Sequence, residues 1–182
     1  MIDRPMYPAD NLKFTTLSDD TRVWLYAADR RLTSQQAEAV RARLRTFMAT
    51  WDSHARNVVS ELALVDNRLL VVGAEVPGGS ISGCGIDKSL HTLDSLAREL
   101  DFVWVNGLHI VYRDQQGQYQ TASRSEFKTL AARGEVDGET PVVDLAMQHL
   151  GHLRGRGLEV PLATSWHSRF LGHVPTTSDS AT

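Results

Sequence analysis

The residues best suited to chemistry lie in the stretch PGGSISGCGIDKS, residues 77–89, which holds the chain's one cysteine. Gly83, Cys84 and Gly85 precede a segment with helical spacing, so their backbone amides should lie at the amino end of a helix. Such amides lack acceptors, and the helix dipole adds positive potential, so an anion can bind there. The sequence therefore predicts that this loop binds an anionic or phosphorylated small ligand.

Cys84 is also a candidate nucleophile, because the positive end of a helix stabilises a thiolate and makes the thiol more reactive. Asp87 and His91 follow at helical spacing on the same side, so the candidate catalytic residues are Cys84, Asp87 and His91. His109, in a later strand, is a further candidate base. The alternative is that Cys84 is a small buried apolar residue, the commonest role of a free cysteine.

The expected ligand-binding residues combine the loop with three positions elsewhere in the chain. A purely structural alternative stays open, in which Ser82 or Asp87 caps the helix and the glycines only permit the turn. His54 is a doubtful partner for Cys84, because the end of the first helix is expected at the opposite end of the sheet from the loop. The ligand-binding set is Ser82, Gly83, Gly85, Lys88, Arg30, Trp51 and His54.

The elements that position the loop follow from the apolar periodicity. Residues 21–32 alternate as in a strand that is covered on both faces and central in its sheet. Thr33 and Gln36 form a capping box that begins an amphipathic helix. Asp66-Asn67 lies between two apolar runs and predicts a tight hairpin. After the loop, a stripe of apolar residues at helical spacing marks the buried side of a second helix. These residues are Ile86, Leu90, Leu93, Leu96 and Leu100.

This order of elements predicts an α+β fold with a ferredoxin-like split βαβ core over residues 22–113. The core would be one antiparallel sheet, with residues 107–113 as its last strand and both helices on one face. An α/β extension over residues 114–173 would hold a hairpin, a short helix capped by Ser123 or Ser125, and another helix near residues 140–153. One domain over 1–173 and a disordered tail over 174–182 complete the prediction.

Composition and missing motifs exclude several functions. A net charge of −3 gives no general attraction to nucleic acid or anionic membranes. No basic segment followed by an apolar run begins the chain, and no long apolar segment occurs, so a cytoplasmic protein is expected. One cysteine with scattered histidines such as His149 and His152 has no zinc-like spacing, so neither a metal nor another cofactor is expected.

Four segments carry a resemblance to a known family: VWLYAADRRL, FMATWDSH, SGCGIDKS and SWHSRF. Together they resemble a family of small uncharacterised bacterial proteins that often carry the label ABC transporter ATPase. The features that recur in this resemblance are Trp24, Tyr26 and Arg30, then Trp51 and His54, and the loop residues. The resemblance implies no known activity. The ATPase label does not suit this sequence, because it has no G-x-x-x-x-G-K-[ST] motif and Asp87 stands where glycine would precede the lysine.

Two functions therefore remain open for this sequence. The first is the binding of an anionic small ligand at the loop, with or without chemistry at Cys84. The second is a non-catalytic module that docks a protein or RNA on its sheet or near Trp51, although the aromatic pattern of RNA-binding sheets is absent. Neither the ligand, the partner nor the oligomeric state follows from the sequence.

Overall fold

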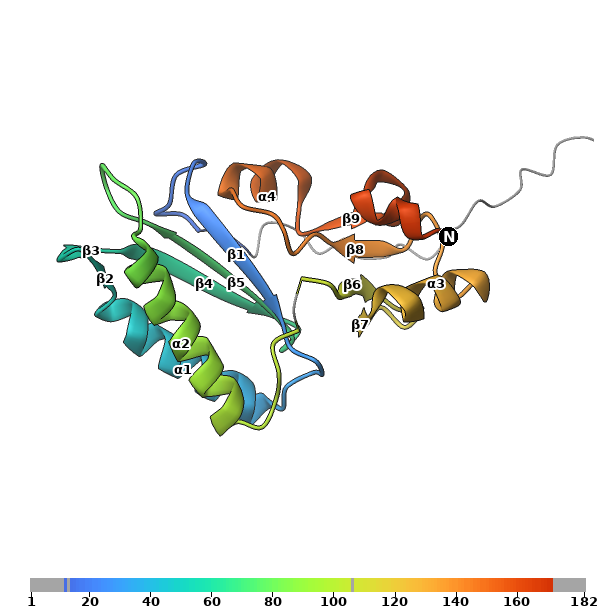
Figure 1. Cartoon of the computed structure of the whole chain (residues 1–182), viewed down its shortest axis with the longest axis horizontal. Coiled ribbons are helices and arrows are strands. Elements are labelled where there is room, and N and C mark those ends of the chain that lie inside the picture. Colours follow the sequence, from blue (N-terminus) through green and yellow to red (C-terminus); the bar gives the residue numbers. More distant parts are fainter. Residues whose placement is uncertain (1–11, 13, 106, 172–182) are drawn as a thin grey trace, which may run out of the picture.

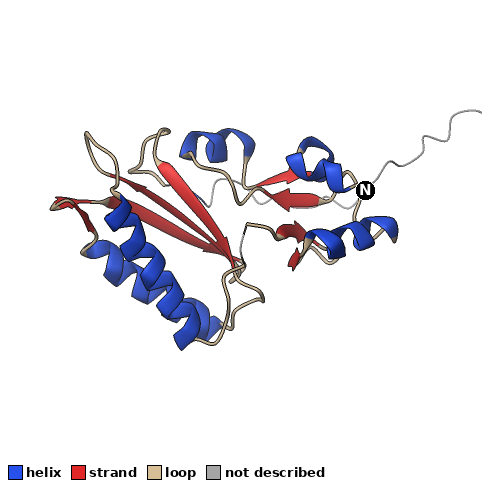
Figure 2. Cartoon of the chain, viewed as in Figure 1, coloured by secondary structure: helices blue, strands red, loops and turns tan. Residues whose placement is uncertain are grey.

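The computed structural model describes residues 12, 14–105 and 107–171 (Figure 1). These residues form an α+β structure with four α-helices and three antiparallel sheets (Figure 2). No helix among them is both long and apolar enough to span a membrane. The predicted disordered tail, 174–182, lies outside the described residues.

The first half of the chain builds a three-stranded sheet, called sheet A here, in the order β1-β5-β4. Both long helices, α1 and α2, lie on one side of it (Figure 1). The capping box at Thr33 is confirmed: its side chain accepts from Gln36 N, and the Gln36 side chain accepts from Thr33 N. The hairpin at Asp66 and Asn67 is confirmed too, with φ values of 50° and 52°. The elements are β1 (Arg22–Ala27), α1 (Ser34–Ala49), β2 (Asp52–Ser53), β3 (Arg56–Asn57), β4 (Val59–Val65), β5 (Leu69–Glu75) and α2 (Gly83–Glu99).

The ferredoxin-like topology over residues 22–113 is not evident. Sheet A has three strands, its central strand is β5 rather than β1, and β6 (Ile110–Arg113) belongs to a different sheet. The chain after α2 meets β1 in one isolated bridge, between Ala28 and Trp104. It then forms a short hairpin between β6 and β7 (Tyr119–Ala122). Closing that short loop costs less chain entropy than a long-range pairing, so a local partner is favoured for β6.

The second half of the chain forms a four-stranded sheet, called sheet B here, in the order β7-β6-β8-β9. Ser123 caps its first helix as expected. The single helix expected near residues 140–153 is wrong, because Pro141 begins a strand and Asp144 accepts from Ala146 N in a turn. Pro141 has no amide to donate within a helix, and the two valines after it favour a strand. The elements are α3 (Arg124–Ala132), β8 (Pro141–Val143), α4 (Leu150–Arg156), β9 (Glu159–Pro161) and the 3₁₀ turns η2 (Leu162–Thr164) and η3 (Trp166–Phe170).

Both faces of sheet A are covered by described residues. On one face, α1 and α2 pack against the sheet through Val40, Leu44 and Leu93. On the other face, one apolar cluster joins the sheet to Phe14 and Leu17, to sheet B and to α4. Leu90, expected in the buried stripe of α2, is 41% exposed. Its position lies at the margin of the face that α2 turns towards the sheet, so solvent reaches it.

Arginine side chains connect the two halves. Arg68, only 6% exposed, donates to Ala28 O and Asp29 O after β1, and to Tyr119 O and Thr121 Oγ1 of β7. Burial lowers the pKa of Arg68 from its usual value. These bonds supply donors to the buried carbonyls of Ala28 and Tyr119, which lie between sheet A and sheet B.

Arg113 makes a second connection. It pairs with Glu159 of β9 at 2.7 Å and with Asp66 of the β4–β5 turn at 3.0 Å. Tyr119 donates its hydroxyl to the same Glu159, and the guanidinium of Arg113 lies 3.9 Å from the Tyr119 ring centroid. The hairpin turn of sheet A is therefore bonded directly to sheet B.

Candidate functional site at the start of helix α2

Ser82 caps α2, which is one of the two caps that the sequence suggested. Its Oγ accepts from Gly85 N at 3.2 Å, and its carbonyl accepts from Ile86 N at 3.0 Å. The amides of Gly83 and Cys84 donate to no group among the described residues. Asp87 is not the cap. The first turn of this 17-residue helix therefore keeps two backbone donors for water or a ligand.

The short hairpin of β2 and β3 holds the start of α2 in place. Ser53 Oγ accepts from Ser82 N at 2.8 Å and lies 2.9 Å from Ser82 Oγ. Trp51 Nε1 donates to Gly85 O at 2.9 Å. A Cβ on Gly85 would lie 3.3 Å from the side chain of Ser53 and 2.9 Å from that of Ile81. Glycine is needed at 85 because Ile81 of the loop and Ser53 of the hairpin approach the helix backbone so closely.

The contact between this hairpin and α2 corrects one expectation. The end of α1 and the start of α2 lie at the same end of sheet A (Figure 1), not at opposite ends. Each helix runs opposite to the strand before it, and β1 and β5 are antiparallel, so α1 and α2 are antiparallel as well. His54, at φ 52° in the turn of this hairpin, therefore lies beside the region of the loop after all.

Two cations lie beside the start of α2. Lys88 Nζ pairs with Asp52 Oδ1 at 2.7 Å, and this hydrogen bond and charge lower the pKa of Asp52 from its usual value. Arg56 donates to Pro77 O in the preceding turn. That turn is closed by a bond from Gly79 N to Val76 O at 2.9 Å. Both charged side chains are anchored at their tips while staying exposed.

Cys84 is exposed on the first turn of α2, so the alternative of a buried apolar cysteine is wrong. Asp87 and His91 are exposed on the same side of the helix, three and seven residues further on. Within the described part of the chain, no hydrogen bond or ion pair links these three side chains to one another or to His54. Their catalytic role stays a prediction.

Three candidate residues do not line the exposed side of the loop: Arg30, Trp51 and His109. Arg30 donates to Asp101 O, just beyond the far end of α2. Trp51 is 3% exposed and packs on Phe47 with ring centroids 5.1 Å apart. His109 precedes β6 in the other half of the chain. Trp51 therefore supports the loop from beneath, and Arg30 lies away from it.

A hollow of about 460 Å³ lies on the other side of the loop, between the start of β1 and the end of β5. Glu75 in its wall accepts from Thr21 and from Ser18 at 2.9 Å. These bonds, chiefly the one from Thr21, lower the pKa of Glu75 and keep it ionised. An anion is therefore better placed at the first turn of α2, where a Cβ on Gly83 would meet nothing within 4 Å.

Sequence reasoning missed Ser53, Asp52 and Arg56, which hold the loop in place. The signal available was the run WDSHAR directly after a helical pattern, in which a serine and two charges follow a tryptophan. Only the hairpin geometry turns Ser53 inward to 3% exposure beside the cap. In the part of the chain that the structure describes, no group of three or more His, Cys, Asp or Glu side chains could hold a metal ion.

Comparison with known proteins found no match to a family model, to a curated protein or to a solved structure. The resemblance to small bacterial proteins stays a prediction. The function of this chain therefore has to be inferred from the positions and contacts of its own residues.

Proposed function

We propose that the protein binds a small anionic group, such as a phosphate or a carboxylate, at the first turn of α2. The observation that carries the proposal is the pair of adjacent amides on Gly83 and Cys84, two exposed residues whose amides have no acceptor among the described residues. Helix amino ends with such free donors bind anions because the amides and the helix dipole act together.

The rigidity of the surrounding contacts supports this proposal. Ser53 and Trp51 hold the cap and the helix backbone from the inner side, so the two amides are fixed before a ligand arrives. Preorganised donors lose little freedom on binding. The ion pair of Lys88 with Asp52 is exposed, and exposed pairs contribute little to stability, so Lys88 can exchange its partner for a ligand.

Chemistry at Cys84 is the second part of the proposal. A ligand held through its anionic group would bring its neighbouring atoms close to the sulfur, which lies on the same turn. Asp87 and His91 are the proposed proton acceptors, because they share the exposed side of α2. The matching electrophile is an ester beside the anion: the sulfur would bond to the carbonyl carbon, the C–O bond would break, and the alcohol would leave with the proton taken from the thiol, after which water would hydrolyse the thioester.

The test uses two substitutions at one position. Gly83→Pro removes the amide, and proline suits the first helical residue, particularly because Ser82 is already extended at ψ 161°. Gly83→Ala keeps the amide and has free space for its Cβ. We expect inorganic phosphate to shift the amide resonances of residues 83 and 84 in the native protein and in Gly83→Ala.

In Gly83→Pro, the shift at Cys84 should require several times more phosphate. Equal titration of Gly83→Pro and Gly83→Ala would overturn the proposal, as would phosphate-induced shifts confined to another part of the chain. Lys88→Gln provides an independent check, because loss of its charge should weaken phosphate binding without removing either amide.

A second candidate function is protein interaction through sheet A. Docking at Trp51 or on a sheet face is not favoured, because Trp51 is buried and described residues cover both faces. The outer edge of β4 is the specific feature that favours interaction, since no described strand pairs with it. RNA binding has no comparable support, because base stacking needs an exposed sheet face.

A ferredoxin-like relationship also belongs among the proposals. The order strand, helix, strand, strand, helix over β1, α1, β4, β5 and α2 is that of a split βαβ unit. The bridge from Ala28 to Trp104 lies beside β1, where a further strand would pair. We therefore regard sheet A as a shortened relative of that arrangement.

A further inference from the structure

The outer edge of β4 presents backbone groups in a regular pattern, and no described strand pairs with them. The bond from Ala28 N to Arg68 O at 2.8 Å sets the alternation of the β1–β5 ladder, so alternate residues of β5 bond to β1 and the others to β4. It follows that Ser60, Leu62 and Leu64 direct their backbone N–H and C=O groups away from β5. An exposed strand edge of this kind is a template for another strand.

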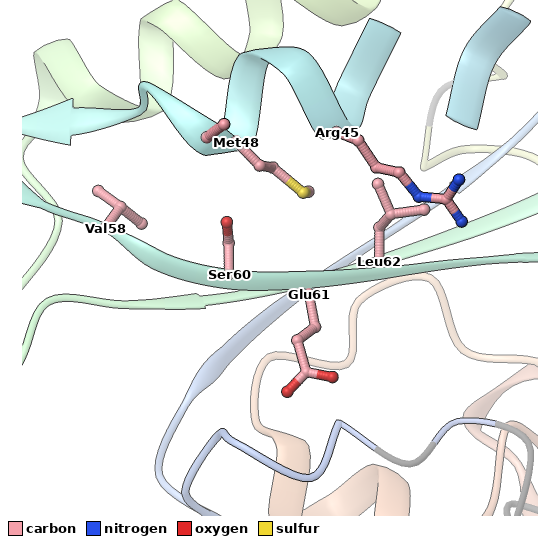
Figure 3. A pocket seen from close by; sticks show the side chains of 7 residues that line it. Arg45, Met48, Val58, Ser60, Glu61 and Leu62 are labelled. Carbon is pink, nitrogen blue, oxygen red and sulfur yellow. The ribbon is translucent and has the colours of Figure 1, made fainter. Parts of the chain in front are cut away.

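An open groove runs beside this edge, between β4 and the last turns of α1 (Figure 3). Its volume is about 420 Å³. Met48 of α1 and Leu62 of β4 supply apolar surface, and Arg45 lies at one end. Ser60 and Leu62 point towards α1, whereas Glu61 points to the opposite face of the sheet (Figure 3). The residues that line it are Arg45, Met48, Ala49, Val58, Ser60, Glu61 and Leu62.

We propose that this edge binds an extended segment of a partner protein, which adds to sheet A as a fourth strand and places a carboxylate beside Arg45. The proposal rests on protein interaction, the second candidate function above, and does not involve the start of α2. Main-chain bonds from Ser60 and Leu62 would hold the segment, and its alternate side chains would enter the groove.

Charge complementarity selects an acidic segment. Arg45 is exposed and forms no ion pair with a described residue. Arg41, one turn earlier, is already paired with Glu38 at 3.7 Å and donates to Leu64 O at 3.5 Å and to Asn67 Oδ1 at 3.1 Å, so the charge beside this edge that a partner would meet is that of Arg45. Glu61 already accepts from Thr16 N at 2.9 Å on the other face. The partner should therefore carry an acidic side chain towards α1.

The spacing of the groove adds a second requirement. Successive side chains of an added strand alternate between faces, so residues two apart share the groove. With an acidic residue beside Arg45, the residue two positions away lies over Met48 and Leu62, which are apolar. The matching segment thus has an acidic and an apolar residue at alternate positions.

A second copy of this chain is a less suitable occupant. Antiparallel pairing of β4 with itself about a two-fold axis would place both α1 helices on the same face of the joined sheet. Each α1 would then bring its Arg45, which forms no ion pair with a described residue, towards the other copy. Ser60, Leu62 and Leu64, the side chains of β4 on that face, provide no acidic group to compensate.

Two fluorescent peptides test the proposal by anisotropy against the full chain. One is Thr-Val-Thr-Glu-Thr-Val-Thr, and the matched control has glutamine in place of glutamate. We expect the glutamate peptide to bind about two- to fivefold more tightly, as for one exposed ion pair. Arg45→Glu should reverse that preference. N-methylation of alternate peptide amides should abolish binding.

Two variants test strand addition in the protein itself. Ser60→Pro removes an outward N–H without breaking the β4–β5 ladder, which is where proline is tolerated in edge strands. Ser60→Ala keeps the N–H. We expect Ser60→Pro to weaken peptide binding about tenfold or more, from a lost hydrogen bond and a clash with the added strand, and Ser60→Ala to retain it. Thermal unfolding of both variants checks that the fold persists.

The outcomes distinguish failure of the acidic preference from failure of protein interaction at this edge. If both peptides bind equally well and Ser60→Pro abolishes the binding of both, the acidic preference is overturned and protein interaction through strand addition stands. Binding that is insensitive to Ser60→Pro and to N-methylation would overturn strand addition. Absence of binding up to about 1 mM would overturn both. A dimer that dissociates in Ser60→Pro would make a second copy the occupant and overturn the assignment to a partner.

Discussion

The start of α2 and the contacts between sheets A and B both contain cationic side chains. These side chains remain available to a ligand at α2, whereas between the sheets they are fixed in structural contacts. Around α2, Lys88, Arg56 and Cys84 are exposed, and their contacts are few. Between the sheets, Arg68 is buried, the side chain of Arg113 is only 10% exposed, and each makes several bonds. Exposed charges remain available to a ligand, whereas buried ones are fixed by the groups that they satisfy. Burial, rather than residue type, separates a candidate site from a structural connection.

Replacement of Arg68 should cause the largest loss of stability of the changes considered. A small loss would contradict the contrast between buried and exposed charges. Arg68→Ala leaves several buried carbonyls without donors, so we expect the free energy of unfolding to fall by about 3 kcal/mol or more. Lys88→Gln should change it by less than about 1 kcal/mol. Urea unfolding of the two variants beside the native protein measures both. Similar losses in the two variants would show that burial does not govern these contacts.

Buried His167 permits a pH test of the same contrast. It is 2% exposed, its ring stacks on Trp166 at 3.8 Å, and burial lowers its pKa to about 4. The unfolded chain binds this proton near pH 6.5, so the folded state loses stability as the pH falls from about 6.5 to 4, by up to about 3 kcal/mol.

In His167→Gln this part of the pH dependence should disappear, while the loss from carboxylates such as Glu75 should remain at lower pH, because their folded pKa values are lowered. The measurement is the slope of unfolding free energy against pH in both proteins. An unchanged slope between pH 6.5 and 4 in His167→Gln would contradict the assignment.

Two glycines two residues apart sharpen the comparison within the candidate site. Gly85→Ala should lower the free energy of unfolding by about 1–3 kcal/mol, because its Cβ meets Ser53 and Ile81. Gly83→Ala should be neutral or stabilising by up to about 1 kcal/mol, since alanine favours a helix and finds free space. Thermal or urea unfolding distinguishes the two. A larger loss at residue 83 would mean that the contacts of residue 85 with Ile81 and Ser53 are not the constraint.

The smallest expected effects concern the rate at which Cys84 reacts. As the one cysteine of the chain, it should be alkylated completely in the folded protein. Lys88→Ala should slow the reaction and Asp87→Asn should accelerate it, each by a few fold, because the charges lie within a turn of the sulfur. Mass spectrometry of timed samples gives the rates. A thiol that reacts only after unfolding would end the nucleophile proposal.

Local patterns predicted much of the structure. The capping box at Thr33, the hairpin at Asp66 and the cap at Ser123 are confirmed, because each depends on residues adjacent in the chain. The helix near residues 140–153 failed because Pro141 and Asp144 interrupt a pattern that apolar spacing alone suggested. Strand pairing failed for β6, because alternation shows that a segment is a strand without showing its partner.

The amino-acid sequence by itself determined that Cys84 lies at a capped helix start, with two glycines and Lys88 close by, because capping and helical spacing act over a few residues. Only the tertiary structure decided that Ser53 and Trp51 hold that start, that Arg30 lies beyond the other end of α2, and that β4 leaves an open edge. These relations join residues far apart in the chain, and packing selects among them by burial and by the satisfaction of buried polar groups.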